Sequence, residues 1–154
     1  MALFLSTYHN KLDKKGRISV PALFRAALSQ QAFSGIVAYG SFVNPCVEAC
    51  GMDRIEKLSR RIETLDPFSD EHDAFSTTIL GGSVQLAFDG EGRITLPEHL
   101  IEFANIGGEA IFVGKGETFE IWEPEAFRAY AERARAVARD QRLKLRSANP
   151  GEGV

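Results

Sequence analysis

Two short segments of the sequence place a carboxylate four residues before a guanidinium. Asp13 precedes Arg17 and Asp89 precedes Arg93, and a glycine stands immediately before each arginine. Across a tight turn, a carboxylate at this spacing can hold the guanidinium in a fixed, exposed position. The free edge of the guanidinium can then bind a phosphate or the edge of a guanine base. These four residues are therefore the candidate binding site.

The two segments differ in charge. Residues 11–17 include Lys14 and Lys15 and carry a net charge of +3, whereas residues 89–93 include Glu91 and carry a net charge of −1. We therefore expect the first turn to contact phosphate and the second to be an auxiliary contact. The structural alternative is that each Asp–Arg pair only fastens a hairpin and that the lysines are solvated.

An enzymatic alternative brings Asp13 and Asp89 together as a carboxylate dyad, as in aspartic proteases. Such a dyad shares one proton, whereas an arginine beside each carboxylate keeps both ionised. The sequence also lacks a nucleophile–base arrangement. We therefore expect no catalytic residues and no enzymatic activity.

The two cysteines raise the possibility of a metal site. Cys46 and Cys50 could form half of one, completed by His9, His72 or His99. There is no second cysteine pair, however, and the histidines are isolated along the chain. We expect both cysteines to be small buried core residues in a reducing cytosol, with no metal or other cofactor and no small-molecule ligand.

The composition is that of a globular protein without a general attraction to polyanions. Of 154 residues, 44% are hydrophobic and 25% charged, and the formal net charge is −3. Binding to nucleic acid must therefore come from a local cluster. Residues 128–146 carry a net charge of +5, which we interpret as a solvated helix face. We expect no secretory leader and no membrane span, since the longest uncharged run, 26–47, is polar.

Both candidate turns belong to a sequence repeat. LDKKGRISVPALFR at 12–25 matches FDGEGRITLPEHLI at 88–101, with five identical positions 76 residues apart. Each copy reads as strand, turn, strand, helix, hairpin and helix. Because half of this chain has too little apolar surface for a core, we expect the copies to interlock into one pseudo-symmetric, β-barrel-like body with helices outside.

The pattern also predicts where the elements begin and end. Asp53 is expected to cap a helix that ends before Pro67, and Ser69 to cap a short one that Gly81 stops. The other expected helices are 21–31, one from Pro97 and one from Pro124. The expected strands are Tyr8–Leu12, Arg17–Val20, Ile36–Tyr39, Cys46–Ala49, Val84–Phe88, Arg93–Leu96, Ala110–Val113 and Thr118–Trp122.

Taken together, these motifs resemble those of the MraZ family of bacterial transcriptional regulators, relatives of the AbrB-type swapped-hairpin DNA-binding proteins. The resemblance covers nearly the whole chain and rests on YHNKLDKKGRISVPALFR, FDGEGRITLPEHL and AIFVGKGETFEIW. It implies an α+β fold with a mainly β core, a double-split β-barrel made of two AbrB-like repeats. The implied divisions are repeat 1 over 1–66, a connecting helix over 67–82, repeat 2 with the C-terminal helix over 83–146, and a disordered tail over 147–154.

The resemblance also implies a function. The protein would be a cytoplasmic, nucleoid-associated regulator, typically a repressor, that binds double-stranded DNA at tandem promoter repeats of the division and cell-wall gene cluster. It would act as a ring-shaped homo-oligomer. An AbrB-like antitoxin is the alternative. The DNA-binding residues implied by the family motif are Asp13, Lys14, Lys15, Arg17, Asp89 and Arg93.

Overall fold

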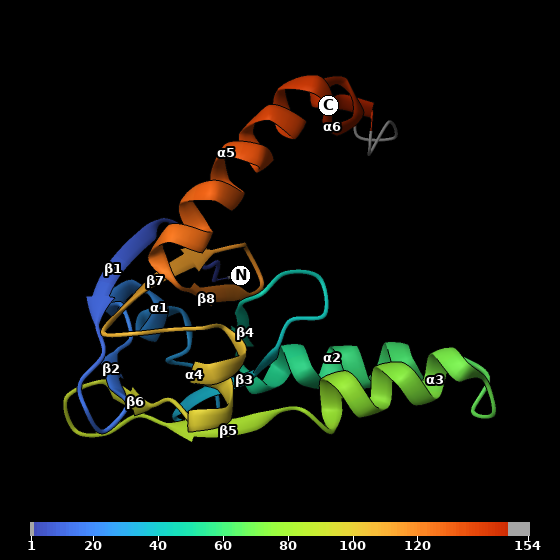
Figure 1. The fold of residues 1–154 in the computed structure, drawn as a ribbon. Coiled ribbons are helices and arrows are strands. Elements are labelled where there is room, and N and C mark those ends of the chain that lie inside the picture. The colour runs from blue at the N-terminus through green and yellow to red at the C-terminus, as the bar shows by residue number, and fades with distance from the viewer. Residues whose placement is uncertain (1, 148–154) are drawn as a thin grey trace. The chain divides into compact units, whose positions relative to one another are not determined.

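A computed structural model describes residues 2–147, which divide into two compact units between Glu123 and Pro124. Figure 1 shows the elements. The strands are β1 Thr7–Lys11, β2 Arg17–Ser19, β3 Gly35–Gly40, β4 Val47–Cys50, β5 Val84–Ala87, β6 Arg93–Thr95, β7 Glu109–Gly114 and β8 Phe119–Trp122. The helices are α1 Ala22–Ala27, α2 Met52–Glu63, α3 Asp70–Phe75, the π-helix η1 Ser76–Leu80, α4 Glu98–Phe103, α5 Pro124–Asp140 and α6 Arg142–Ser147.

The strands form two antiparallel sheets. Six strands pair in the order β1-β7-β8-β4-β3-β5, and β2 pairs with β6 in a separate two-stranded ribbon. Each strand begins and ends within one residue of the bounds expected from the sequence. The α+β class with a mainly antiparallel core is therefore confirmed. Among the described residues no strand pairing joins β1 to β5, so a closed barrel is not shown.

The two repeats are interlocked by their strands. β1 of the first repeat pairs with β7 of the second, and β5 of the second pairs with β3 of the first. The hairpins β3–β4 and β7–β8 stay within their own repeats and meet where β4 pairs with β8. Neither repeat therefore completes a sheet alone, as the shortage of apolar surface in each half predicted.

The β2–β6 ribbon has a local pseudo-twofold axis. Ile18 lies opposite Ile94 at its centre, and both side chains are 1% exposed. Beyond the paired residues, the Val20 amide donates to the Gly92 carbonyl at 3.1 Å. The Leu96 amide donates to the Gly16 carbonyl at 2.8 Å in the same way. Each turn is thus attached to the strand that leaves the other turn.

The core is aromatic at its centre. Phe24 of α1 is 1% exposed, and its ring centroid lies 5.3 Å from Phe4, 4.8 Å from Phe119 and 6.3 Å from Phe112. Trp122 is also buried. Phe24 and Trp122 are therefore core residues. Burial at this position fixes α1 against the sheet that carries both hairpins.

Several helices differ from expectation. α1 spans six residues instead of 21–31 and ends at Ala27, with Leu28 as its C-cap. Gln31 lies beyond the helix, and its Oε1 accepts a hydrogen bond from the backbone amide of Asp53 at 3.1 Å. Gly51, not Asp53, is the N-cap of α2, so that prediction was wrong. Ser69 does cap α3 and accepts from the His72 amide at 3.1 Å. In Figure 1, α2 lies beside the α3–η1 segment.

The C-terminal unit contains α5 and α6. α5 has seventeen residues and no buried side chain, and its Phe127 and Tyr130 rings are 6.4 Å apart. Of the expected tail, 147–154, only Ser147 is described, as the last residue of α6; the rest lies outside the described residues.

Candidate nucleic-acid interface

The first turn is a compact carboxylate-centred unit. One oxygen of Asp13, Oδ1, accepts hydrogen bonds from the backbone amides of Lys15 at 2.9 Å and Arg17 at 2.8 Å. The other, Oδ2, accepts from Arg17 Nε at 2.7 Å. Gly16 has φ +82°, a value that favours glycine. The sequence prediction of a glycine-dependent turn with an Asp–Arg clamp is confirmed.

The second turn repeats this geometry. Asp89 Oδ1 accepts from the backbone amides of Glu91 at 2.8 Å and Arg93 at 3.0 Å, and Oδ2 accepts from Arg93 Nε at 2.8 Å. Gly92 has φ +76°. Two segments 76 residues apart therefore fold into the same hydrogen-bonded turn.

The hydrogen bonds lower the pKa of both carboxyl groups. The backbone amide of Arg17, followed by its guanidinium and the Lys15 amide, holds the pKa of Asp13 below its ordinary value of 3.8. The Arg93 amide does the same for Asp89, and the hydrogen bond to Asp89 raises the pKa of Arg93. A proton-sharing dyad requires the opposite, a raised pKa on one carboxyl group.

The ribbon presents both arginines on one face. Arg17 lies opposite Thr95, and Arg93 lies opposite Ser19, so the two arginines are diagonal neighbours. Diagonal positions of this kind lie roughly 7–8 Å apart. Because side chains alternate along a strand and Ile18 points into the core, these four residues share the opposite face.

The two guanidinium groups differ in what remains free. Among the described residues, the terminal nitrogens of Arg17 have no protein partner. Arg93 Nη1, by contrast, lies 3.7 Å from a carboxylate oxygen of Glu91. Lys14 and Lys15 are exposed beside Arg17 and form no ion pair with the described residues. The first turn therefore offers more unneutralised positive charge, as its sequence predicted.

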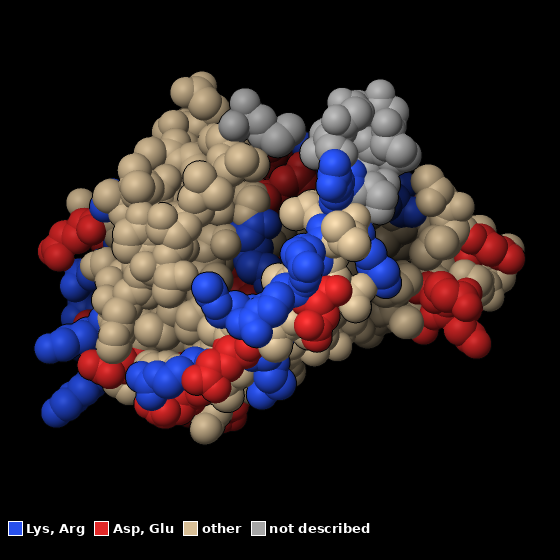
Figure 2. Space-filling model, turned by 90° about the horizontal axis from the view of Figure 1, so that it is seen from above, with Lys and Arg blue, Asp and Glu red and all other residues tan. Residues whose placement is uncertain are grey.

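Outside the two turns, residues 128–146 also carry a net positive charge, +5. On the face in Figure 2, lysine and arginine side chains are interspersed with acidic ones.

Each turn also borders a groove. The groove at the first turn has a volume of about 570 Å³ and includes Lys14 and Lys15. The groove at the second turn has a volume of about 340 Å³ and includes Arg25.

Arg25 was not among the residues selected from the sequence. It belongs to α1 of the first repeat, yet its guanidinium carbon lies 2.7 Å from where a Cβ on Gly92 would be. The repeat aligns Arg25 with Ile101, which lies beside Gly16 of the other turn, but no pattern in the sequence indicates either contact.

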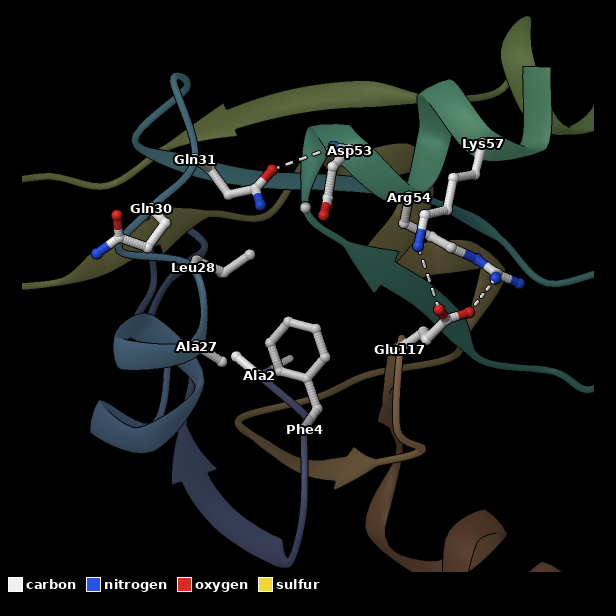
Figure 3. Close-up of a pocket in the computed structure, with 11 residues that line it drawn as sticks. Ala2, Phe4, Ala27, Leu28, Gln30, Gln31, Asp53, Arg54, Lys57 and Glu117 are labelled. Carbon is white, nitrogen blue, oxygen red and sulfur yellow. Dashed lines mark hydrogen bonds and ion pairs between the residues drawn. The ribbon is translucent and has the colours of Figure 1, made fainter. Parts of the chain in front are cut away.

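A third cavity, of about 360 Å³, lies between α1 and the start of α2 (Figure 3). Arg54 and Lys57 both point to the carboxylate of Glu117 there, and Gln31 points to Asp53. Arg54 and Lys57 therefore share the carboxylate of Glu117, and none of the residues that line this cavity belongs to either turn. It is separate from the Asp–Arg site.

The cysteines are buried, as predicted. Cys46 is fully buried and Cys50 is 1% exposed, and both are free thiols. Burial raises the pKa of Cys50 to about 12 and that of Cys46 further, so neither forms a thiolate near neutral pH. Within residues 2–147, no three His, Cys, Asp or Glu side chains gather as metal ligands would.

Residues 2–147 include no helix with both the length and the apolar character that a bilayer-crossing segment requires.

Comparison with known proteins shows which family this chain resembles. A family model described as "MraZ protein, putative antitoxin-like" matches residues 3–45 and 79–147. The chain is 54% identical over 149 residues to proteins named transcriptional regulator MraZ from Rickettsia felis and Rickettsia canadensis, covering 97% of this chain and 100% of each relative. The Rickettsia bellii protein of that name is 53% identical over 150 residues.

Proposed function

The chain belongs to the MraZ family, and from this membership we propose that it is a DNA-binding transcriptional regulator that acts as a repressor. The observation that carries the proposal is the pair of braced arginines on one exposed face of the β2–β6 ribbon. A two-stranded ribbon fits the major groove of B-DNA, which is about 12 Å wide. The double helix is thus a partner of suitable size and charge.

We assign a role to each residue of the first turn. Arg17 contacts the DNA directly, because its terminal nitrogens have no partner among the described residues. Asp13 positions that guanidinium through the 2.7 Å bond to Nε and does not itself approach the phosphates. Lys14 and Lys15, both exposed, contact the backbone phosphates on either side.

The second turn supplies a weaker contact of the same kind. Arg93 is positioned by Asp89 as Arg17 is by Asp13, but Glu91 competes for its Nη1. The pseudo-twofold relation of the two turns suits two contacts to neighbouring base pairs or phosphates. We retain the division into repeats 1–66 and 83–146, joined by 67–82, and propose that the two sheets together correspond to the family's double-split β-barrel.

We also propose a ring-shaped homo-oligomer that binds tandem promoter repeats of the division and cell-wall gene cluster, in the cytoplasm at the nucleoid. One turn supplies only a few phosphate contacts, and the net charge of −3 opposes binding elsewhere. Several subunits on successive DNA repeats would raise the effective concentration of each later contact. Light scattering tests the assembly: we expect a species much larger than a dimer, and a monomer would contradict the ring.

The test of DNA binding is selection of duplexes from a random pool by the purified protein, followed by gel shift. We expect a short tandem motif, and Arg17→Ala to weaken binding about tenfold to a hundredfold. Arg60→Ala is the matched control, because Arg60 is equally charged, exposed and outside both turns. Equal affinities of wild type and Arg17→Ala would reject the proposed site.

The antitoxin alternative is favoured by one observation, the words "antitoxin-like" in the description of the matching family model. An antitoxin would bind DNA and also neutralise a second protein. Co-purification from the native host distinguishes the two functions. A stoichiometric small unrelated protein bound to the wild-type chain would favour the antitoxin, and recovery of the homo-oligomer alone would favour the regulator.

A further inference from the structure

The second turn rests on an arginine from the opposite repeat. A Cβ on Gly92 would lie 2.7 Å from both Cζ and Nε of Arg25, so the guanidinium group packs directly over the glycine. Nε of Arg25 donates to the Val20 carbonyl at 3.1 Å. This bond fixes the direction of the guanidinium. Within residues 2–147, its two terminal nitrogens have no protein partner.

The first turn has an apolar residue in the equivalent place. Ile101, 76 residues after Arg25, has its Cδ1 3.7 Å from the corresponding Cβ position on Gly16. The two turns therefore obtain positive charge from different sides. At the first turn, Lys14 and Lys15 stand on the turn itself; at the second, the cation comes from the helix that supports the turn.

The groove beside Arg25 has the groups that a phosphate requires. It has a volume of about 340 Å³, and its lining includes Arg25, the hydroxyl-bearing Ser29 and Ser34, and Gly90. Asp89 also lines it, but its carboxylate oxygens accept hydrogen bonds from Glu91 and Arg93 of its own turn. The remaining lining residues are Leu28, Gln31, Phe88 and Gly92. Ser29, Ser34 and Gly90 are exposed, and the space above the Gly90 Cα is open to 4 Å. A fixed guanidinium with neighbouring hydroxyls and exposed backbone suits a phosphate oxygen better than an apolar ligand.

We infer that Arg25 is a phosphate-binding residue and that the groove at the second turn takes a backbone phosphate of the DNA. The inference rests on the proposed function and extends it. It assigns to α1 of the first repeat the charge that the second turn lacks. The DNA-binding surface of the second turn is then built by both repeats, because the helix of one supports the turn of the other.

Two substitutions at one position separate charge from packing. Arg25→Gln keeps a long polar stem and removes the charge, while Arg25→Lys keeps the charge. With the full-length protein and the selected duplex, affinity is measured over a series of salt concentrations. We expect Arg25→Gln to bind about tenfold more weakly at low salt, with a salt slope smaller by about one unit, the value for one phosphate. Arg25→Lys should retain the wild-type slope.

A purely structural role for Arg25 predicts another result. In that case the melting temperature of both variants would fall, while the dependence of DNA affinity on salt concentration stayed that of wild type. This outcome would overturn the inference. Titration with inorganic phosphate at fixed ionic strength shows whether the groove binds free phosphate instead of a DNA phosphate. Loss of phosphate binding in Arg25→Gln with an unchanged DNA salt slope would assign the groove to free phosphate and reject the DNA contact.

Failure of this inference is distinguishable from failure of the proposed function. If Arg17→Ala loses affinity and Arg25→Gln does not, the regulator assignment stands and the role given to Arg25 is wrong. If the wild-type protein selects no duplex at all, the proposed function itself is wrong.

Discussion

Arg17 lies diagonally across the β2–β6 ribbon from Arg93, on the face opposite the buried isoleucine pair at its centre. Each arginine is fastened by a carboxylate from its own turn, at 2.7 Å and 2.8 Å from Nε. The two repeats thereby bring their equivalent charges to one surface. The effects of removing each arginine can therefore be compared within one molecule.

Arg93→Ala should weaken DNA binding less than Arg17→Ala. Glu91 lies 3.7 Å from Arg93 Nη1 and partly neutralises it, whereas Asp13 is the one acidic partner of Arg17 within residues 2–147. Gel shifts of both variants on the same duplex provide the measurement. A larger loss for Arg93→Ala would mean that the second turn is the principal contact.

Lys14→Ala and Lys15→Ala should weaken binding to all duplexes alike, because a lysine on a phosphate carries little sequence information. The slope of log affinity against log salt should fall by about one unit for each lysine that is removed. Comparing specific with random duplexes checks this. A weakening confined to the specific duplex would assign the lysine to a base.

The hydrogen bonds between Asp13 and Arg17 should persist in moderately acidic solution. Since the pKa of Asp13 in the folded protein lies below 3.8, its contribution to stability is fully present above that value and is lost as the pH falls through the lowered pKa. Urea unfolding of wild type and Asp13→Asn, repeated across the acidic pH range, gives the difference in their free energies of unfolding at each pH. The stability difference should stay constant down to about pH 4 and then shrink; shrinkage beginning near neutral pH would contradict the assignment.

Gly16→Ala should destabilise the fold by about 1–2 kcal/mol, because an alanine at φ +82° is strained. Its Cβ would also lie 3.0 Å from the Leu96 carbonyl oxygen. Gly107→Ala is the control, since no atom lies within 4 Å of a Cβ there. Denaturant unfolding measures the loss of unfolding free energy in each variant. An equal loss in both would show that the turn does not require a glycine at position 16.

Phe24→Ala should cost about 3–5 kcal/mol of unfolding free energy. The ring is 1% exposed and packs against the rings of Phe4, Phe112 and Phe119. Calorimetry gives the change. Phe42→Ala, at a side chain that is 57% exposed, is the control and should cost much less.

The sequence predicted features that depend on neighbouring residues. The turn at Asp13 could be read from its own chemistry, as could the cap at Ser69, because the groups that make each hydrogen bond lie within four residues. The strands were predictable for a similar reason, since alternation along a few residues decides which face is buried.

Features that depend on distant partners could not be read in this way. Asp53 was predicted to cap a helix, but its amide donates to Gln31, 22 residues earlier, and Gly51 is the N-cap. The approach of Arg25 to Gly92 depends on how two repeats interlock, which no local pattern contains. The two Asp–Arg turns of the candidate site were thus predicted, whereas Arg25 of the supporting helix α1 was missed.

The exchange of strands between repeats also governs when the protein can fold. Thr7 pairs with Val113, so the first strand emerges from the ribosome long before its neighbour has been synthesised. Pairings so distant in sequence slow folding, because the loop between them must close first. The nascent chain must keep this strand unpaired until the second repeat has been translated, which ties the folding of the first repeat to the synthesis of the second.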